Sequence, residues 1–258
     1  MIKKLQNTTL KLSPVLSLIV IAVLWLFVSE GGLIPAYMLP SPLEVIKAFV
    51  TDFPVILRHA FVTLQEALYG LFSGIASGFI ISVLMDRFSF LYKALYPILV
   101  ITQTIPTIAI APLLVLWMGF SLAPKITLVI ITTFFPITVA LLDGYKSADK
   151  DAVRLLKSMG ASRFQIFRHI KFPSSLPSFF SGLKVSASYA VVGAVIAEWL
   201  GGFEGLGVYM TRVKKAYAFD KMFAVILFIC LVSLVLMGTV TLVSKISMPW
   251  NNKERSDK

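Results

Sequence analysis

Long apolar blocks alternate with short polar segments along this chain. A helix that crosses the hydrocarbon core of a bilayer needs about 20 mostly apolar residues in succession. Six stretches meet this requirement: Leu12–Val28, Thr63–Met85, Leu91–Phe120, Ile126–Leu142, Leu176–Leu200 and Met222–Ser244. The third is long, and its three prolines indicate a kink. The pattern predicts an all-α membrane protein with about six transmembrane helices, organised as a single transmembrane domain over residues 1–258.

Composition agrees with this reading. The chain is 57% hydrophobic and only 14% charged, with a mean hydropathy of +0.86, whereas soluble domains are about 25% charged. The net charge of +11 comes from basic residues spread over several loops. They form no stripe interleaved with aromatic residues, so the charge does not indicate nucleic-acid binding.

The N-terminal apolar run follows three lysines and could therefore belong to a secretory signal peptide. Against this, Val28-Ser29-Glu30-Gly31 offers no small-x-small cleavage site, and the run is long for a signal sequence. We favour a retained first span. The single Cys230 lies inside the last span and implies no disulfide framework.

Basic residues also predict the orientation. With six spans, both termini lie on the side that carries seven lysines and arginines between Lys146 and Lys171, together with Lys253, Arg255 and Lys258. The other side carries fewer basic residues, among them Lys47 and Lys125. The positive-inside rule then places both termini and the loop at residues 143–173 in the cytoplasm.

The loop at residues 143–173 is predicted to form two short helices joined at Gly160, because glycine adopts a left-handed conformation at a helix end without steric cost. Ser162 and Gln165 have the spacing of a capping box that would start the second helix. Pro173 and Pro177 are predicted to end it.

Each of these helices presents an apolar face that the loop cannot bury by itself. Ala152, Leu155, Leu156 and Met159 share a face of the first helix, and Phe164, Phe167 and Ile170 share a face of the second. The other faces are basic: Lys150, Arg154, Lys157, Arg163, Arg168 and Lys171. The pattern indicates a surface that docks a protein partner.

Several residues inside the predicted spans could serve either packing or transport. Gly70, Gly74 and Gly78 recur every four residues, and helix–helix packing explains them best. A proline interrupts the polar segment of Gln103, Thr104 and Pro106. This segment either packs against other helices or lines a translocation pathway, and the sequence leaves both interpretations open.

Two acidic residues lie near span ends. A structural or solvated role is our first choice for Glu66. Glu198 either lines a pathway or gate or lies at the interface, because an intramembrane carboxylate is costly and marks a functional site by default. Gly201 to Gly207 is predicted to form a turn on the outer side, and Gly205 and Gly207 join the candidate gate residues.

No catalytic or metal-binding motif is present in the sequence. His59 is predicted to lie in an outer loop and His169 in the basic loop, so neither forms part of a metal site. We therefore expect no catalytic residue, no bound metal and no cofactor in this chain.

The chain resembles the permeases of ABC importers. Gly160, nine intervening residues and then Ile170-Lys171-Phe172-Pro173 resemble the "EAA" signature of their cytoplasmic loop. Further segments resemble the nitrate/sulfonate/taurine branch: Leu39-Pro40-Ser41-Pro42, Ile105-Pro106, Ala111-Pro112-Leu113, Trp117-Met118-Gly119, Phe134-Phe135-Pro136-Ile137, Gly182-Leu183, Ala197-Glu198 and Gly205-Leu206-Gly207. The stretch from Ala197 to Lys215 is also similar to members linked to pyrimidine precursors of thiamine.

The chain departs from the signature at two points. Arg154-Leu155-Leu156 stands where the family has Glu-Ala-Ala, and Phe172 replaces the usual leucine. The first change replaces a negative charge by a positive one at the docking surface. The sequence therefore does not establish whether a specific ion pair with the ATPase forms there.

The resemblance implies an importer permease (MetI-like) fold in the inner membrane of a prokaryote. It also implies a permease homodimer, two cytoplasmic ATPase subunits that hold the ATP and Mg, and an external solute-binding protein. The docking residues would be Leu156, Met159, Gly160, Ala161, Arg163, Phe164, Phe167, Ile170 and Pro173. The alternative is a secondary carrier or membrane enzyme that works without an ATPase, and the sequence does not name the solute.

Overall fold

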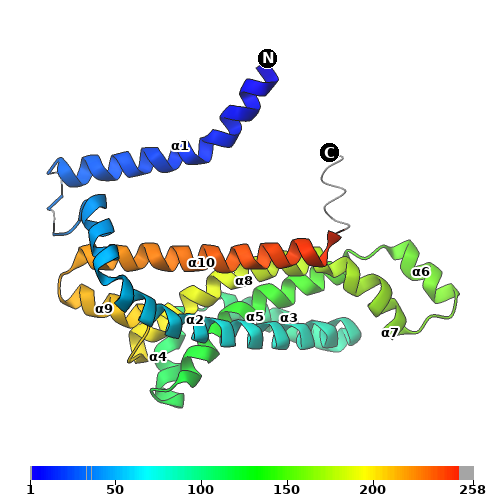
Figure 1. The fold of residues 1–258 in the computed structure, drawn as a ribbon. Helices are drawn as coiled ribbons and strands as arrows, with labels where there is room; N and C mark the ends of the chain where they lie inside the picture. The colour runs from blue at the N-terminus through cyan, green and yellow to red at the C-terminus, as the bar shows by residue number, and fades with distance from the viewer. Residues whose placement is uncertain (1, 33, 36, 250–258) are drawn as a thin grey trace. The chain divides into compact units, whose positions relative to one another are not determined.

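The computed structural model describes residues 2–32, 34–35 and 37–249, which form helices and connecting turns without any strand (Figure 1). Lys253, Arg255 and Lys258, which contribute to the predicted orientation, lie outside the described residues. The helices are α1 (Ile2–Glu30), α2 (Pro42–Arg87), α3 (Ser89–Thr104), α4 (Thr107–Met118), α5 (Leu122–Lys146), α6 (Lys150–Ser158), α7 (Arg163–Ile166), the π-helix η1 (Phe167–Lys171), α8 (Phe172–Gly201), α9 (Leu206–Lys215) and α10 (Phe219–Ser247).

Among the described residues, five helices are long and apolar enough to cross a membrane, and the bent pair α3–α4 supplies a sixth span if it is counted as one. The predicted all-α membrane architecture is therefore confirmed. The two halves of the bent pair meet at 101°. Ile105 is extended, with φ −81° and ψ 121°, because a residue before proline is disfavoured in helical conformation.

The described residues form two compact units. The smaller comprises Met1–Leu57 and Tyr209–Phe228, and the larger comprises Arg58–Val208 and Ile229–Lys258. In the smaller unit, the indole nitrogen of Trp25 donates to the Pro40 carbonyl at 3.1 Å, and its ring lies 5.9 Å from that of Phe223. Lys221 pairs with Asp52 at 2.8 Å, and the Tyr209 hydroxyl donates to the same carboxylate. Burial and Asp52 raise the pKa of Tyr209 above its usual value.

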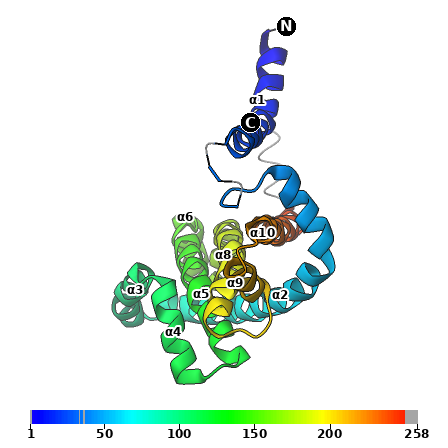
Figure 2. The ribbon, with the colours of Figure 1, turned by 90° about the vertical axis from the view of Figure 1, so that its left-hand side faces the viewer.

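The larger unit is built around α5 and α8, which lie side by side in both views (Figures 1 and 2). The glycine stripe of α2 packs against α5. A Cβ atom at Gly70 would lie 2.3 Å from Val129, one at Gly74 would lie 2.2 Å from Thr133 Oγ1, and one at Gly78 would lie 3.0 Å from Ile137. These contacts confirm the predicted packing role, since only glycine allows so close an approach.

Helix α2 begins much earlier than the predicted span. Ser41 and Glu44 cap it reciprocally: the Ser41 N–H donates to Glu44 Oε2 at 2.8 Å, and the Glu44 N–H donates to Ser41 Oγ at 3.3 Å. This capping box extends the helix over a stretch that carries several polar side chains. The expectation that His59 lies in a loop is therefore wrong; His59 is helical and buried.

Candidate functional site

The loop between α5 and α8 begins with a well-capped helix. The Asp149 side chain accepts hydrogen bonds from the Asp151 N–H at 2.8 Å and the Ala152 N–H at 3.5 Å, which starts α6 at Lys150. At the other end Gly160 has φ +80°, as predicted. The Gly160 N–H donates to the Lys157 carbonyl at 3.0 Å and the Ala161 N–H donates to the Leu156 carbonyl at 2.9 Å, the two bonds of a Schellman motif.

The second capping box is also present. The Ser162 N–H donates to Gln165 Oε1 at 2.7 Å, and the Gln165 N–H donates to Ser162 Oγ at 3.3 Å. Local hydrogen bonds therefore fix the chain direction on both sides of Gly160. Nothing within 4 Å would meet a Cβ there, so only the backbone conformation restricts this position to glycine.

The predicted end of the second helix at Pro173 is wrong. Helix α7 is only four residues long and continues through the π-helix η1 directly into α8. The Phe172 N–H donates to the Phe167 carbonyl five residues back, and Pro173 falls in the first turn of α8. Proline is tolerated there because it needs no helical hydrogen bond to its nitrogen.

The π-turn also divides the predicted apolar face of the second helix. Phe167 turns inward, with its ring 5.3 Å from that of Tyr145 and 6.2 Å from that of Phe172. Ile166 is buried, and Ile170 is half-buried. Sequence reasoning missed Ile166, because a regular helical spacing gives no sign of the π-turn.

Three large apolar side chains of the loop point outward. Leu155 is 62% exposed, Met159 73% and Phe164 68%. They flank the Gly160 turn, whereas Leu156 and Ala161 are half-buried. We call Leu155, Met159 and Phe164 the apolar triad.

Basic residues surround the apolar triad on the same loop. The exposed ones are Lys150, Arg154, Lys157, Arg163 and Arg168. Arg154 pairs with Asp151 at 3.2 Å, but both side chains are well exposed, so this pair contributes little. Lys171 is different, because it contacts both oxygens of Asp86 at 2.7 and 2.8 Å and so ties the end of the loop to α2.

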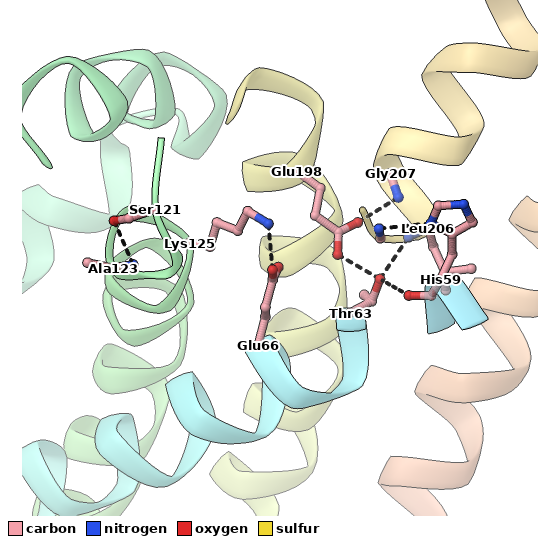
Figure 3. Close-up of polar contacts among 10 residues, drawn as sticks. His59, Thr63, Glu66, Ser121, Ala123, Lys125, Glu198, Leu206 and Gly207 are labelled. Carbon is pink, nitrogen blue, oxygen red and sulfur yellow. Dashed lines mark hydrogen bonds and ion pairs between the residues drawn. The ribbon is translucent and has the colours of Figure 1, made fainter. Parts of the chain in front are cut away.

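A second polar cluster surrounds Glu198 at the other end of α8 (Figure 3). Thr63 donates to Glu198 Oε1 at 2.6 Å, and the Gly207 N–H donates to Glu198 Oε2 at 2.6 Å. The Leu206 N–H donates to Thr63 Oγ1 at 2.8 Å, and the Gly205 N–H donates to His59 Nδ1 at 3.0 Å. The side chains of Thr63 and Glu198 therefore accept hydrogen bonds from the first N–H groups of α9, which have no partner within the helix.

The glycines beside Glu198 are required by this arrangement. Gly205 has φ +124°, and a Cβ there would lie 2.2 Å from the Glu198 carboxylate. A Cβ at Gly207 would lie 2.4 Å from the Val195 carbonyl oxygen. Gly207 is helical, so the predicted turn is shorter than expected and covers only the residues between α8 and α9.

Glu66 forms a buried ion pair beside this cluster (Figure 3). Lys125 Nζ lies 2.5 Å from Glu66 Oε1, and both side chains are at least nine-tenths buried. Lys125 belongs to the first turn of α5. Glu66 Oε2 has no hydrogen-bond partner among the described residues. The pair supports a structural role for Glu66, since burying either charge alone is costly.

Gln103 lines a cavity of about 220 Å³ at the α3–α4 break. The other polar lining residues are Thr102, Thr107, Thr132 and Tyr189. Thr104 and Pro106 lie exposed at the break itself. Glu198, Gly205 and Gly207 do not line this cavity. Of the predicted pathway residues, Gln103 alone lines this cavity. Glu198 instead accepts hydrogen bonds from Thr63 and the Gly207 N–H.

The family model for binding-protein-dependent transport system inner membrane components matches residues 70–245. The chain belongs to this family. The formylaminopyrimidine transport permease protein of Halalkalibacterium halodurans is 35% identical over 94% of this chain and 97% of its own length. The taurine transport system permease protein of Escherichia coli is 25% identical over 92% of this chain and 89% of its own length.

A solved structure of the MetNI methionine ABC transporter, in an inward-facing conformation, has the same fold. It superposes with a TM-score of 0.67 at 18% identity, covering 76% of this chain and 97% of that chain. The chain is therefore a multi-pass inner-membrane permease of the ABC importer type with a MetI-like fold. The resemblance seen in the sequence is confirmed, and nothing supports a secondary carrier or a membrane enzyme.

Proposed function

We propose that two copies of this permease form the pore of an ABC importer, and that each copy binds one cytoplasmic ATPase subunit through the loop at residues 143–173. ATP and Mg belong to the ATPase subunits, and this chain binds no cofactor. A solute-binding protein delivers the solute at the opposite face, and both termini of the permease are cytoplasmic. Membership of the family and the distribution of basic residues support this arrangement.

The observation that carries the proposal is the apolar triad. Leu155, Met159 and Phe164 are each more than 60% exposed, and most of the other exposed residues of this loop are polar or charged. Grouped apolar side chains inside a polar rim are typical of a protein interface. The surrounding arginines and lysines fit the rim of such an interface, where charges steer association more than they add affinity.

The loop is also held firmly enough to transmit movement. The Schellman motif and the capping box fix the Gly160 turn. The end of the loop is tied to the spans by the Lys171–Asp86 ion pair and by the packing of Phe167 on Tyr145. A displacement of the docked apolar triad would therefore move α8 and its neighbours, which is the mechanical requirement for coupling ATP hydrolysis to transport.

The solute is a small organic or anionic molecule. Relatives are named as permeases for formylaminopyrimidine, riboflavin, aliphatic sulfonates, taurine and nitrate. Their names divide the candidates into heteroaromatic molecules and small anions or zwitterions, and this permease carries a member of one of these classes.

The test of the proposal is Phe164→Asp in the assembled transporter. A carboxylate in the apolar contact would lose its hydration, so we expect much less ATPase to co-purify with the permease and uptake to fall in proportion. His169→Asp is the matched control, because it adds the same charge at an exposed polar position of the same loop. Undiminished ATPase binding and uptake in Phe164→Asp would contradict the proposal.

A further inference from the structure

The α3–α4 break brings two helix ends of opposite polarity to one place. Helix α3 ends at Thr104 and α4 begins at Thr107. The C-terminus of α3 presents carbonyl acceptors with partial negative charge, and the N-terminus of α4 presents N–H donors with partial positive charge. Pro106 provides no side-chain cap for these donors. Broken helices of this kind form solute sites in many transporters.

The cavity at the break is polar but uncharged. Thr102, Gln103, Thr107, Thr132 and Tyr189 line it together with three isoleucines. The Thr102 hydroxyl donates to the Leu99 carbonyl at 2.7 Å and that of Thr132 donates to the Val129 carbonyl at 2.9 Å, which leaves their oxygens as acceptors. The Gln103 amide has no hydrogen-bond partner within the described part of the chain.

Charge decides which solute this cavity suits. The charged residues of α8, Lys184 and Glu198, are not among its lining residues, and neither are Glu66 and Lys125. An anion that leaves water there would find no cation to compensate the loss of hydration. The two helix ends offset each other, so they suit a dipolar molecule that needs both donors and acceptors.

Size and shape narrow the solute further. Drug-sized ligands occupy pockets of about 300–1,000 Å³, so a cavity of about 220 Å³ suits a single ring with small substituents. Tyr189 is 49% exposed, and its ring offers a flat surface on which an aromatic ring can stack. Gln103 supplies both an amide donor and a carbonyl acceptor.

We propose that this cavity is a transit site of the permease and that it accepts a small, uncharged, planar heteroaromatic solute in preference to a small anion. The inference rests on the proposed function and removes the small anions from its candidate solutes. The solute stacks on Tyr189, exchanges hydrogen bonds with Gln103, and meets the N–H groups of α4 and the carbonyl groups of α3.

Protection of an introduced thiol tests the site directly. Cys230 is the only cysteine of the chain, so Ile105→Cys in a Cys230→Ser background gives a single reactive position in the permease. Ile105 lines the cavity, and this change keeps both Gln103 and Tyr189. The whole transporter, in membrane vesicles, is labelled with a water-soluble maleimide in the presence of formylaminopyrimidine or of ethanesulfonate, a small anion. We expect formylaminopyrimidine to slow labelling several-fold and ethanesulfonate to leave it unchanged. Thr107→Cys, at the start of α4, should show the same protection if Ile105→Cys fails to fold.

The control is Phe203→Cys, because Phe203 is 74% exposed and lies outside the cavity lining; neither compound should protect it. Two results would overturn the inference: no protection at either cavity position, or equal protection by ethanesulfonate. ATPase co-purification and ATP-dependent uptake are measured in the same vesicles. If they persist while protection is absent, only the transit site is refuted and the proposed function stands.

Discussion

Gly160 has a left-handed backbone with open space around it, so within the permease a side chain there strains the backbone conformation and clashes with no neighbouring residue. Gly160→Val should cost about 1–2 kcal/mol locally, open the turn, and separate Met159 from Phe164. We expect normal membrane abundance with weaker ATPase co-purification, or ATPase activity uncoupled from uptake. Abundance, co-purification and uptake are measured together.

Gly160→Asn is the informative comparison, because asparagine tolerates the left-handed region better than a β-branched residue. It should retain most of the coupling that Gly160→Val loses. If both variants behave like the parent, the turn has no role in coupling.

The Glu198 carboxylate is almost completely buried, and it accepts a hydrogen bond from the Gly207 N–H in the first turn of α9. A glutamine has only one acceptor oxygen, so Glu198→Gln cannot keep the bonds from both Thr63 and the Gly207 N–H. We expect a loss of about 1–3 kcal/mol in local stability, seen as faster proteolysis between α8 and α9 and an altered ratio of basal to stimulated ATPase activity, while assembly survives. Parental proteolysis and ATPase ratios would refute this role.

Glu204→Gln serves as the control for Glu198→Gln. Glu204 pairs with Arg58 at 2.6 Å, but both side chains are substantially exposed. Such pairs contribute little, so this variant should match the parent in both measurements.

At the scale of the helices, the α2–α5 contact depends on small residues. A Cβ at Gly74 would lie 2.2 Å from Thr133 Oγ1, so Gly74→Val should overpack this contact and lower the stability of the protein by about 1–3 kcal/mol. We expect a smaller fraction of the protein to remain monodisperse in detergent. Gly238→Val, on α10, is the matched control, because nothing lies within 4 Å of a Cβ there. Equal loss in both variants would mean that the stripe has no special packing role.

Elements set by local chemistry could be predicted from the sequence. The Gly160 turn and the Ser162–Gln165 capping box depend on neighbours a few residues away, and their residue types signal them directly. The α2 capping box of Ser41 and Glu44 has the same signal, but Lys47, Asp52, Arg58 and His59 interrupt the apolar run that follows it.

Features set by long-range contacts could not be predicted. Thr63 and Glu198 are 135 residues apart in the chain, and Glu66 and Lys125 are 59 apart. No spacing rule joins such pairs. The inward turn of Phe167 follows from a π-helix that hydrophobic periodicity does not reveal. Of the apolar side chains predicted to lie on one exposed face, Met159 and Phe164 are exposed, whereas Phe167 packs inward on Tyr145.

For the whole molecule, the central claim is that the α5–α8 loop binds the ATPase. A photo-crosslinking amino acid at Met159 tests it in intact cells, with the same amino acid at Phe203 as control, because these side chains are 73% and 74% exposed and lie in loops at opposite ends of α8. We predict a crosslink to the ATPase subunit from Met159 and none from Phe203. No ATPase crosslink from Met159, or one from Phe203, would contradict the account.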